Sequence, residues 1–282
     1  MNRYAKQVLV PTDFSEESFA ALEYAVFYAN RTDSGIHLIH VANREMLRKQ
    51  GGDVRTYRAL LQDIRQQLRT FRNRSGGAFR IHADYKLSED SVAQTILNYA
   101  ANFEIELCCI GTSGERSAGH RGGLGLNTGR MINEAGFPIL TCRSHPEKIH
   151  FRNILLPIDL TRHTNEKVDR IIRFAMRFNS TVYLLAVSEF MEEFSFSRKS
   201  LLEKLESAAL HIRSQGIKCH TEIIRYDTVS RSVVEYASEI RADLLVVMSE
   251  PQSLVTELIF GNRTSKVIAQ SPIPVISFRP VH

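Results

Sequence analysis

Short apolar runs alternate with longer amphipathic segments along the whole chain. Runs such as "QVLV" and "HLIHV" have the length and the branched residues of buried strands, whereas Leu22, Ala25 and Ala29 recur at the spacing of one helix face. Strands that alternate with helices predict a mostly parallel sheet covered on both faces, an α/β doubly wound fold. For the first half the predicted elements are strands at 6–11, 36–41, 79–85, 105–110 and 137–142 and helices at 15–31, 55–74, 90–102 and 127–135.

The second half of the chain repeats the first. "VLVPTDFS" returns as "ILLPIDLT", so that Asp159 lies 146 residues after Asp13, and the strand–helix–strand pattern that follows keeps this spacing. Near the ends of the halves, matching residues lie 136 apart, so one segment has shortened. The chain is therefore predicted to hold two homologous domains, residues 1–146 and 147–282, joined through the polar "RSHPEK".

Length and composition agree with two globular domains. The chain has 282 residues, of which 43% are hydrophobic and 24% charged. It contains no run of eighteen apolar residues and no leader-like apolar segment near its first residue, which predicts a cytoplasmic protein. The four cysteines form no C-x-x-C pair and are expected to be buried free thiols.

The net charge of +5 is unevenly distributed. The predicted helix at 55–74 carries Arg58, Arg65, Arg69 and Arg72 as a stripe on one face. Such a stripe could contact nucleic acid or anionic lipid. A solvated helix face is the preferred interpretation, because the helix is short and single and carries no interleaved exposed aromatics.

Seven of the fifteen glycines fall in "GTSGERSAGHRGGLGLNTGR", residues 111–130, between a predicted strand and a predicted helix. Gly111 and Gly114 can adopt backbone angles closed to other residues and present bare N–H groups, and Gly125 precedes a helix whose dipole favours an anion. Thr128 could add a hydroxyl donor. The position predicts a phosphate site; a flexible linker is the alternative, but linkers belong between domains.

Common phosphate and nucleophile motifs do not match this loop. No G-x-x-x-x-G-K-[ST] string occurs, and Gly123, Gly125 and Gly129 give G-x-G-x-x-x-G, one residue too long for a dinucleotide fingerprint. "GTSGE" also fails as a G-x-S-x-G elbow. The loop is therefore neither a Walker, nor a dinucleotide, nor a serine-hydrolase motif.

The loop instead resembles that of the universal stress protein family, in which G-x-x-G, about nine residues and then G-[ST] bind the ribose and phosphates of ATP. "VLVPTDFSEES", "HLIHV" and "FPILTCR" match the first, second and last strands of that family in order, and the resemblance covers the chain twice. It implies two five-stranded, adenine nucleotide alpha hydrolase-like sheets packed as a pseudo-twofold pair. It also implies ATP as the ligand, with or without Mg²⁺.

For the adenine end, the resemblance implies that Pro11, Thr12 and Asp13 hold the base and that Val41 contacts it through its backbone. A carboxylate at Asp13 can accept a hydrogen bond from the exocyclic amine of adenine. Considered alone, Asp13 fits equally well as a turn residue ahead of a helix capped by Ser15. The sequence leaves both interpretations open.

For the ribose and phosphates, the implied residues run from the end of one strand to the start of the next helix. They are Ile110, Gly111, Gly114, Gly125, Leu126, Asn127 and Thr128. Two departures from the family pattern weaken the expected binding: ten residues follow Gly114 before Gly125, and Leu126 stands where Ser or Thr is usual. A missing hydroxyl bond would cost roughly 1.5 to 3 kcal/mol unless Thr128 or Asn127 replaces it.

The matching loop in the second half lacks these features. Met248 and Pro251 stand in the places of Gly111 and Gly114, and Glu250 and Glu257 add negative charge nearby. Proline has no N–H, and carboxylates repel phosphate. The second domain is predicted to reject ATP, which leaves at most one nucleotide per chain. Its remaining Asp159 and Gly261 are expected to serve the turn and the helix start.

Three functions are compatible with these sequence features. The first is a nucleotide-responsive protein of stress response or signalling, in which ATP or its slow hydrolysis alters the surface offered to an unknown protein partner. The second is a nucleotide-free scaffold that acts through dimerisation or through its basic helix; an intramolecular pseudo-dimer is expected, and association of two chains is left open. The third and least favoured is an adenylating or hydrolytic enzyme. No catalytic residue or metal ligand is assigned, and His37, His40 and His82 are expected to be packed in the sheet or to lie at its edges. No membrane contact is expected.

Overall fold

The computed structural model describes most of the chain in stretches separated by gaps. The described residues are 6–43, 59, 62–63, 65–70, 73, 81–88, 91–112, 124–145, 147–159, 163–188, 196–225, 228–249 and 261–280. The chain divides into two compact units, a first unit of Met1–Ile149 and a second unit of His150–His282.

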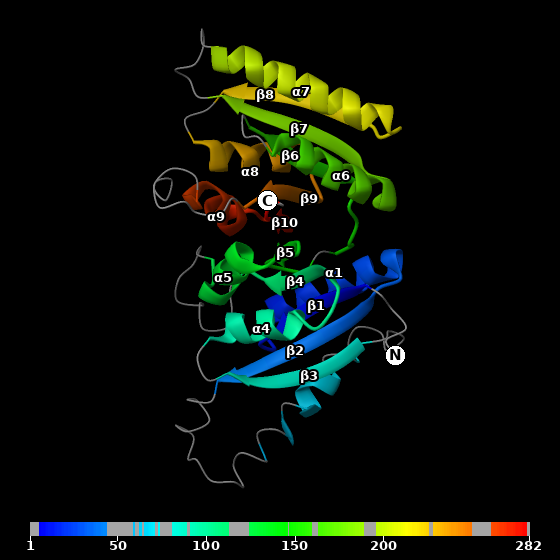
Figure 1. Ribbon diagram of the computed structural model, residues 1–282, viewed down its shortest axis with the longest axis vertical. Helices are drawn as coiled ribbons and strands as arrows, with labels where there is room; N and C mark the ends of the chain where they lie inside the picture. Colours follow the sequence, from blue (N-terminus) through cyan, green and yellow to red (C-terminus); the bar gives the residue numbers. More distant parts are fainter. Residues whose placement is uncertain are drawn as a thin grey trace. The chain divides into compact units, whose positions relative to one another are not determined.

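The first unit is a parallel sheet with helices between its strands (Figure 1). Its strands run in the spatial order β3-β2-β1-β4-β5, and every ladder between neighbours is parallel. The strands are β1 (Gln7–Thr12), β2 (Gly35–Asn43), β3 (Ile81–Ser88), β4 (Ile105–Gly111) and β5 (Ile139–Cys142). The helices are α1 (Glu16–Thr32), α4 (Val92–Ala100) and α5 (Leu126–Glu134).

The second unit has the same order of strands, β8-β7-β6-β9-β10, again with parallel ladders. Its strands are β6 (Asn153–Ile158), β7 (Thr181–Ser188), β8 (Cys219–Arg225), β9 (Leu244–Met248) and β10 (Val275–Phe278). Its helices are α6 (Thr164–Phe178), α7 (Phe196–Ser214), α8 (Val229–Glu239) and α9 (Gly261–Gln270). The predicted α/β fold of two repeated units with parallel sheets is confirmed.

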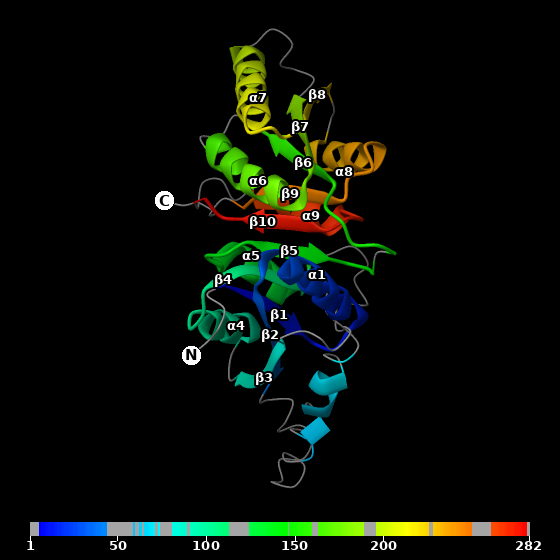
Figure 2. The ribbon, with the colours of Figure 1, turned by 90° about the vertical axis from the view of Figure 1, so that its right-hand side faces the viewer.

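Helices cover both faces of each sheet. In the first unit α1 lies on one side of the strands, and α4 and α5, which pack against each other, lie on the other (Figure 2). In the second unit α6 and α7 share one side, and α8 and α9 share the opposite side. Right-handed crossovers place helices in this way, and both faces of the strands are apolar as a result. Val8, Leu9 and Val10 of β1 have no exposed surface.

Local signals in the sequence explain where α1 begins and ends. The Ser15 hydroxyl accepts a hydrogen bond from the Ser18 N–H at 3.2 Å, which caps the first turn. At the other end Asp33 adopts a left-handed conformation with φ of 51°, and its N–H bonds the Ala29 carbonyl. Asn179, which lies 146 residues later, ends α6 in the same way with φ of 52°. The repeat seen in the sequence is therefore a repeat of backbone geometry.

The observed bounds differ from the predicted ones by up to three residues. β3 extends to Ser88 because its ladder with β2 continues until Ser88 pairs with Asn43. α4 is shorter than predicted because Ser91 caps it, accepting the Gln94 N–H at 3.4 Å. No helix in the described ranges is both long enough and apolar enough to cross a membrane.

Candidate functional site

The carboxyl ends of β1 and β4 lie side by side at the centre of the first sheet, because these strands pair with each other. β1 leads to β2 on one side and β4 leads to β5 on the other, so the order of strands reverses between them. Ligands of doubly wound sheets bind at such a point, beyond the carboxyl ends of the strands. The candidate site is bounded by the turn after Thr12 and by the segment after Gly111.

Side-chain hydrogen bonds hold the turn after β1 in a fixed shape. The buried Thr12 hydroxyl accepts the Phe14 N–H at 3.0 Å and lies 3.0 Å from the Ser18 hydroxyl. Phe14 has φ of 68°, in the left-handed region that side chains seldom adopt. Asp13 Oδ1 accepts the N–H and the hydroxyl of Ser15, at 3.1 and 2.5 Å. Asp13 therefore acts as a turn residue here; a contact with a base remains a prediction.

His40 of β2 braces the same turn from the neighbouring strand. Its ring stacks on that of Phe14, with 4.5 Å between the ring centroids, and its Nδ1 lies 2.8 Å from the Thr12 carbonyl oxygen. A carbonyl oxygen only accepts, so Nδ1 carries the proton and donates it. Burial lowers the pKa of His40 and outweighs the opposite effects of the Thr12 carbonyl and Asp13. At neutral pH His40 is thus a neutral donor that fixes the turn.

Gly111 ends β4 directly beneath the first turn of α1. A Cβ at Gly111 would lie 3.0 Å from the Glu17 Cβ and 3.4 Å from its carboxylate Oε2, so a side chain there would require Glu17 to shift slightly. Gly111 does not have a positive φ. The backbone angles that only glycine adopts are therefore not used at Gly111, and the close approach of α1 favours glycine there. The next residue, Thr112, donates both its N–H and its hydroxyl to the Cys142 carbonyl of β5, at 2.9 and 3.0 Å.

The start of α5 turns some of its polar groups inward and leaves others open. The Gly125 N–H donates to the Thr112 carbonyl at 3.0 Å, and the buried Thr128 hydroxyl donates to the Gly111 carbonyl at 2.9 Å. Neither group is available to a phosphate in this arrangement. The N–H groups of Leu126, Asn127 and Thr128 have no acceptor among the described residues, and no side chain caps the helix. Three amides at the positive end of a helix dipole can receive an anion.

The other predicted site residues lie around this point or outside the described ranges. Pro11 is buried in β1, Val41 is half-buried at the end of β2, and Ile110 is buried in β4. Asn127 is exposed, and 93% of the Leu126 surface is exposed. Gly114, together with the rest of 113–123, lies outside the residues that the structure describes.

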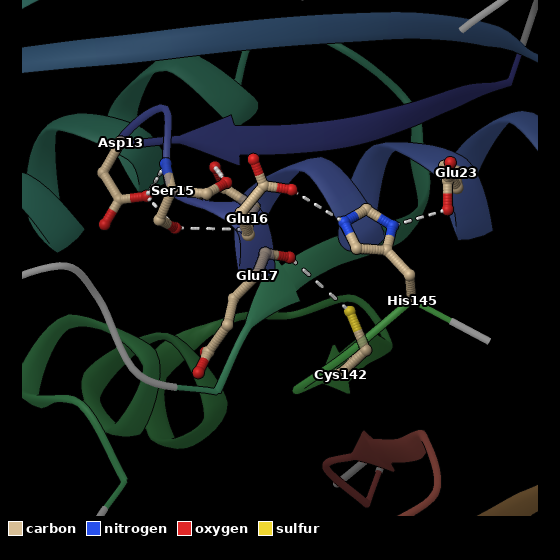
Figure 3. A network of polar contacts seen from close by, with 8 residues as sticks. Asp13, Ser15, Glu16, Glu17, Glu23, Cys142 and His145 are labelled. Carbon is tan, nitrogen blue, oxygen red and sulfur yellow. Dashed lines mark hydrogen bonds and ion pairs between the residues drawn. The ribbon is translucent and has the colours of Figure 1, made fainter. Parts of the chain in front are cut away.

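Two acidic side chains of α1 bind a histidine that follows β5. His145 Nδ1 lies 2.8 Å from Glu23 and its Nε2 lies 3.2 Å from Glu16 (Figure 3). Desolvation lowers the pKa of His145, but the hydrogen bonds and charges of Glu23 and Glu16 outweigh it and raise the pKa overall. A histidine ring shared by two carboxylates therefore ties the segment after β5 to α1.

The cysteines are structural rather than reactive. Cys108, Cys109, Cys142 and Cys219 are all free and buried, as predicted. Burial raises the pKa of each thiol above its ordinary value. Thiolates, which are the nucleophiles and metal ligands, are therefore disfavoured at all four positions.

The predicted basic stripe is partly described. Arg65 and Arg69 are exposed on helical residues 65–70, whereas Arg58 and Arg72 lie outside the described side chains. The Arg65 guanidinium lies 5.6 Å from the centroid of the Tyr85 ring on β3. Exposure of both arginines agrees with a solvated helix face. Within the described part of the chain, no group of three His, Cys, Asp or Glu side chains could hold a metal ion.

The second unit keeps one contact of this site and changes another. The Thr264 hydroxyl donates to the Met248 carbonyl at 3.3 Å, as Thr128 does to Gly111. Asp159, however, forms an ion pair through both carboxylate oxygens with Lys167 Nζ, at 3.0 and 2.9 Å.

The Lys167 side chain is only 6% exposed, so the pair is anchored in the fold. The Asp159 carbonyl also accepts the Thr164 hydroxyl at 3.3 Å at the start of α6, in keeping with the role expected for Asp159 in the turn. Residues 250–260, including Pro251, lie outside the described ranges.

Three features of the site are not predicted by the sequence. They are the His40 brace, the position of Glu17 above Gly111 and the Lys167 ion pair. "HLIHV" carries a signal for the first, since Thr12 and His40 are ladder partners once the parallel register is known. For Glu17 the sequence indicates only a place in a helix start. Lys167 falls on the apolar face of α6, where a buried lysine indicates a carboxylate partner.

Comparisons with known proteins agree with the repeated fold. The profile of the universal stress protein family matches residues 5–143 and 150–279. The universal stress protein Slr1230 of Synechocystis sp. is 20% identical over 298 residues, which cover 97% of this chain and 100% of that protein. The universal stress protein Sll1654 of the same organism is 29% identical over 135 residues, covering 45% of this chain and 85% of that protein.

Among solved structures, a universal stress protein from Archaeoglobus fulgidus has the same architecture over nearly the whole length. The two structures superpose with a TM-score of 0.75 at 19% identity, covering 99% of this chain and 98% of the other. At this identity the likeness concerns the fold.

Proposed function

The chain belongs to the universal stress protein family, and we propose that it acts in stress response or signalling by binding one adenine nucleotide in its first unit. The observation that carries the proposal is the start of α5, where three N–H groups without acceptors among the described residues stand at the switch point of the sheet. Helix ends of this kind bind phosphate in other nucleotide-binding folds.

In this proposal the nucleotide extends from the turn after β1 to the start of α5. The base lies against Pro11, Thr12 and Asp13 and the backbone of Val41, and the Asp13 carboxylate accepts a hydrogen bond from the exocyclic amine. The His40 brace supports this assignment because it holds the backbone on either side of Asp13 in one conformation. A preorganised turn loses less entropy when it binds a ligand.

The ribose and phosphates lie beyond β4 in this proposal. Ile110, Gly111 and Gly114 line them, the two glycines without a side chain, Gly125 shapes the helix start, and Leu126, Asn127 and Thr128 donate their backbone N–H groups. Because the Thr128 hydroxyl already bonds Gly111, its contribution would come from its amide. ATP is the expected nucleotide, with or without Mg²⁺.

The second unit takes no nucleotide in this proposal. Asp159, which matches Asp13, has its carboxylate engaged by Lys167, so a base that approached would have to compete with an anchored ion pair. One nucleotide per chain is therefore expected.

Equilibrium dialysis of the full chain with labelled ATP tests the proposal, using two matched variants. Asp13→Asn keeps an oxygen acceptor for Ser15 but turns an amide donor toward the exocyclic amine of adenine. Because the charge-assisted hydrogen bond to the base is lost, the variant should bind ATP about tenfold or more weakly. Asp159→Asn, the same change in the second unit, should leave the affinity unchanged. Two equivalent sites per chain, or equal effects of both variants, would refute the assignment.

A nucleotide-free scaffold is the second candidate function. The inward hydrogen bonds of Gly125 and Thr128 and the exposure of Leu126 favour it, because they remove two donors and place an apolar side chain beside the amides. Mass spectrometry of the purified protein separates the two functions. A co-purifying adenine nucleotide supports nucleotide binding. If the protein retains no nucleotide even after incubation with millimolar nucleotide, the result supports the scaffold.

A further inference from the structure

His40 connects the two backbone segments that border the proposed position of the base. It belongs to β2 and directly precedes Val41, whose backbone is assigned to the base. Its side chain reaches β1, where Nδ1 donates to the Thr12 carbonyl at 2.8 Å, directly before Asp13. One half-buried side chain therefore holds the turn that carries the Asp13 carboxylate against the end of β2.

The turn needs this support because its backbone is strained. Phe14 has φ of 68°, which is unfavourable for a residue that carries a Cβ and persists only where neighbouring contacts hold it. The His40 ring supplies one such contact by stacking on Phe14, with 4.5 Å between the ring centroids. The Thr12 hydroxyl supplies another by accepting the Phe14 N–H at 3.0 Å. Asp13 therefore lies between two residues that His40 contacts directly.

The second unit has a different set of residues in these places. Each member of the brace has an apolar counterpart 146 positions later: Ile158 for Thr12, Leu160 for Phe14 and Ala186 for His40. Ile158 and Ala186 are ladder partners, as Thr12 and His40 are, so the backbone register is the same. An alanine methyl neither donates a hydrogen bond nor stacks as a ring does. The repeated fold therefore forms without the brace, which accompanies the unit in which a nucleotide is proposed.

We propose that His40 is a positioning residue through which the first unit distinguishes amino-substituted purines, such as adenine, from oxo-substituted purines, such as hypoxanthine. This rests on the proposed nucleotide site, in which the Asp13 carboxylate accepts a hydrogen bond from the exocyclic amine. Hypoxanthine presents a carbonyl oxygen at that position and a ring N–H beside it. A carboxylate held in place then faces another acceptor, whereas a carboxylate that can shift reaches the neighbouring N–H. Discrimination therefore requires a fixed turn, and His40 fixes it.

The expected size of the discrimination follows from a hydrogen bond to a charged group. The parent chain should bind AMP about tenfold to a hundredfold more tightly than inosine monophosphate, whose base offers the held carboxylate no donor. Without the brace this preference should fall to about threefold or less, because both bases then find a donor for the carboxylate. Ribose phosphate has no base, and its affinity should not change.

The test measures the affinities of AMP, inosine monophosphate and ribose phosphate for the full chain and its variants by equilibrium dialysis. His40→Phe keeps a ring against Phe14 and removes the donor, whereas His40→Asn keeps an amide donor near the position of Nδ1 and removes the ring. The preference for AMP is expected to fall to about threefold or less in His40→Phe and to stay within about threefold of the parent value in His40→Asn. If His40→Phe does not fold, His40→Ala replaces it with the same expected loss, since the second unit carries Ala186 at the matching position.

His37→Phe is the matched control, because it makes the same change earlier in β2, where Nδ1 lies 2.9 Å from the Tyr99 hydroxyl. It should lower the stability of the first unit but change the preference for AMP by less than about twofold. The inference is overturned, while the nucleotide site stands, if the parent chain does not distinguish the two nucleotides or if His40→Phe changes all three affinities by one factor or changes none. If AMP binds neither the parent chain nor the variants, the proposed function fails and the inference fails with it.

Discussion

Acid should destabilise the first unit through one buried histidine, His37. His37 is 5% exposed, its Nδ1 lies 2.9 Å from the Tyr99 hydroxyl, and its ring centroid lies 4.1 Å from that of Phe103. Burial, and then the charge of nearby His82, lower the pKa of His37 to about 4 from an ordinary 6.5, although Asp84 acts in the opposite direction. The folded state therefore takes up the proton much less readily than the unfolded chain does.

The sign and size of the effect follow from linkage. Because the pKa is lower in the folded state, the contribution of His37 is fully present above pH 6.5 and is lost as the pH falls toward 4. At a pH of about 5 the unfolded histidine is almost fully protonated and the folded one is mostly neutral. The free energy of unfolding should then be about 2 kcal/mol lower than at a pH of about 7.5 from this residue alone.

The assay is urea unfolding of the full chain at these two pH values, followed by circular dichroism because the chain has no tryptophan. His37→Asn keeps a polar atom near the position of Nδ1 and cannot take up a proton. Between the two pH values its free energy of unfolding should therefore fall by about 2 kcal/mol less than that of the parent chain. His220→Asn is the control: this histidine also stacks on an aromatic ring, that of Tyr183, but is exposed. Equal losses in the parent chain and in His37→Asn would show that the reasoning is wrong.

Three further changes test other contacts. The pKa of His145 is raised in the fold, so its ion pairs stabilise below pH 6.5 and are lost as the pH rises through the raised value. In urea titrations, His145→Gln should lower the free energy of unfolding at about pH 6 but not at about pH 9, by less than about 1 kcal/mol because the side chain is 34% exposed. Thr128→Val leaves the Gly111 carbonyl without its donor and should lower the free energy of unfolding by about 1 to 2 kcal/mol in urea titrations. Asp159→Ala leaves the buried Lys167 ammonium without its carboxylate and should lower the free energy of unfolding by about 2 kcal/mol or more. Lys167→Met leaves a half-exposed carboxylate and should lower it by less. Thermal unfolding of both variants tests this order of stabilities.

The order of elements could be predicted because it depends on local patterns. Periods of two and 3.6 residues separate strands from helices, and the 146-residue repeat supplies each element twice. The local pattern places the end of β3 too early because its last residues are paired by β2, a contact distant in sequence. Element ends set by tertiary pairing carry only a weak local signal.

The candidate site could be predicted in outline only. The glycine cluster and the helix after it mark a strand-to-helix junction, but neither shows which polar groups point inward. That the Thr128 hydroxyl bonds Gly111, or that Lys167 reaches Asp159, depends on side-chain rotamers and on the distance between a helix and a strand end. At Gly111 the sequence points to backbone angles open to glycine, whereas the structure shows tight packing against Glu17.

Hydrogen–deuterium exchange of the full chain with and without AMP tests the central claim most directly, because it reports on the amides that are proposed to hold the phosphate. Exchange at residues 126–128 is expected to slow when AMP is added, with no change at the matching start of α9. Unchanged exchange at the start of α5 at saturating AMP, or equal slowing in both units, would contradict the proposal.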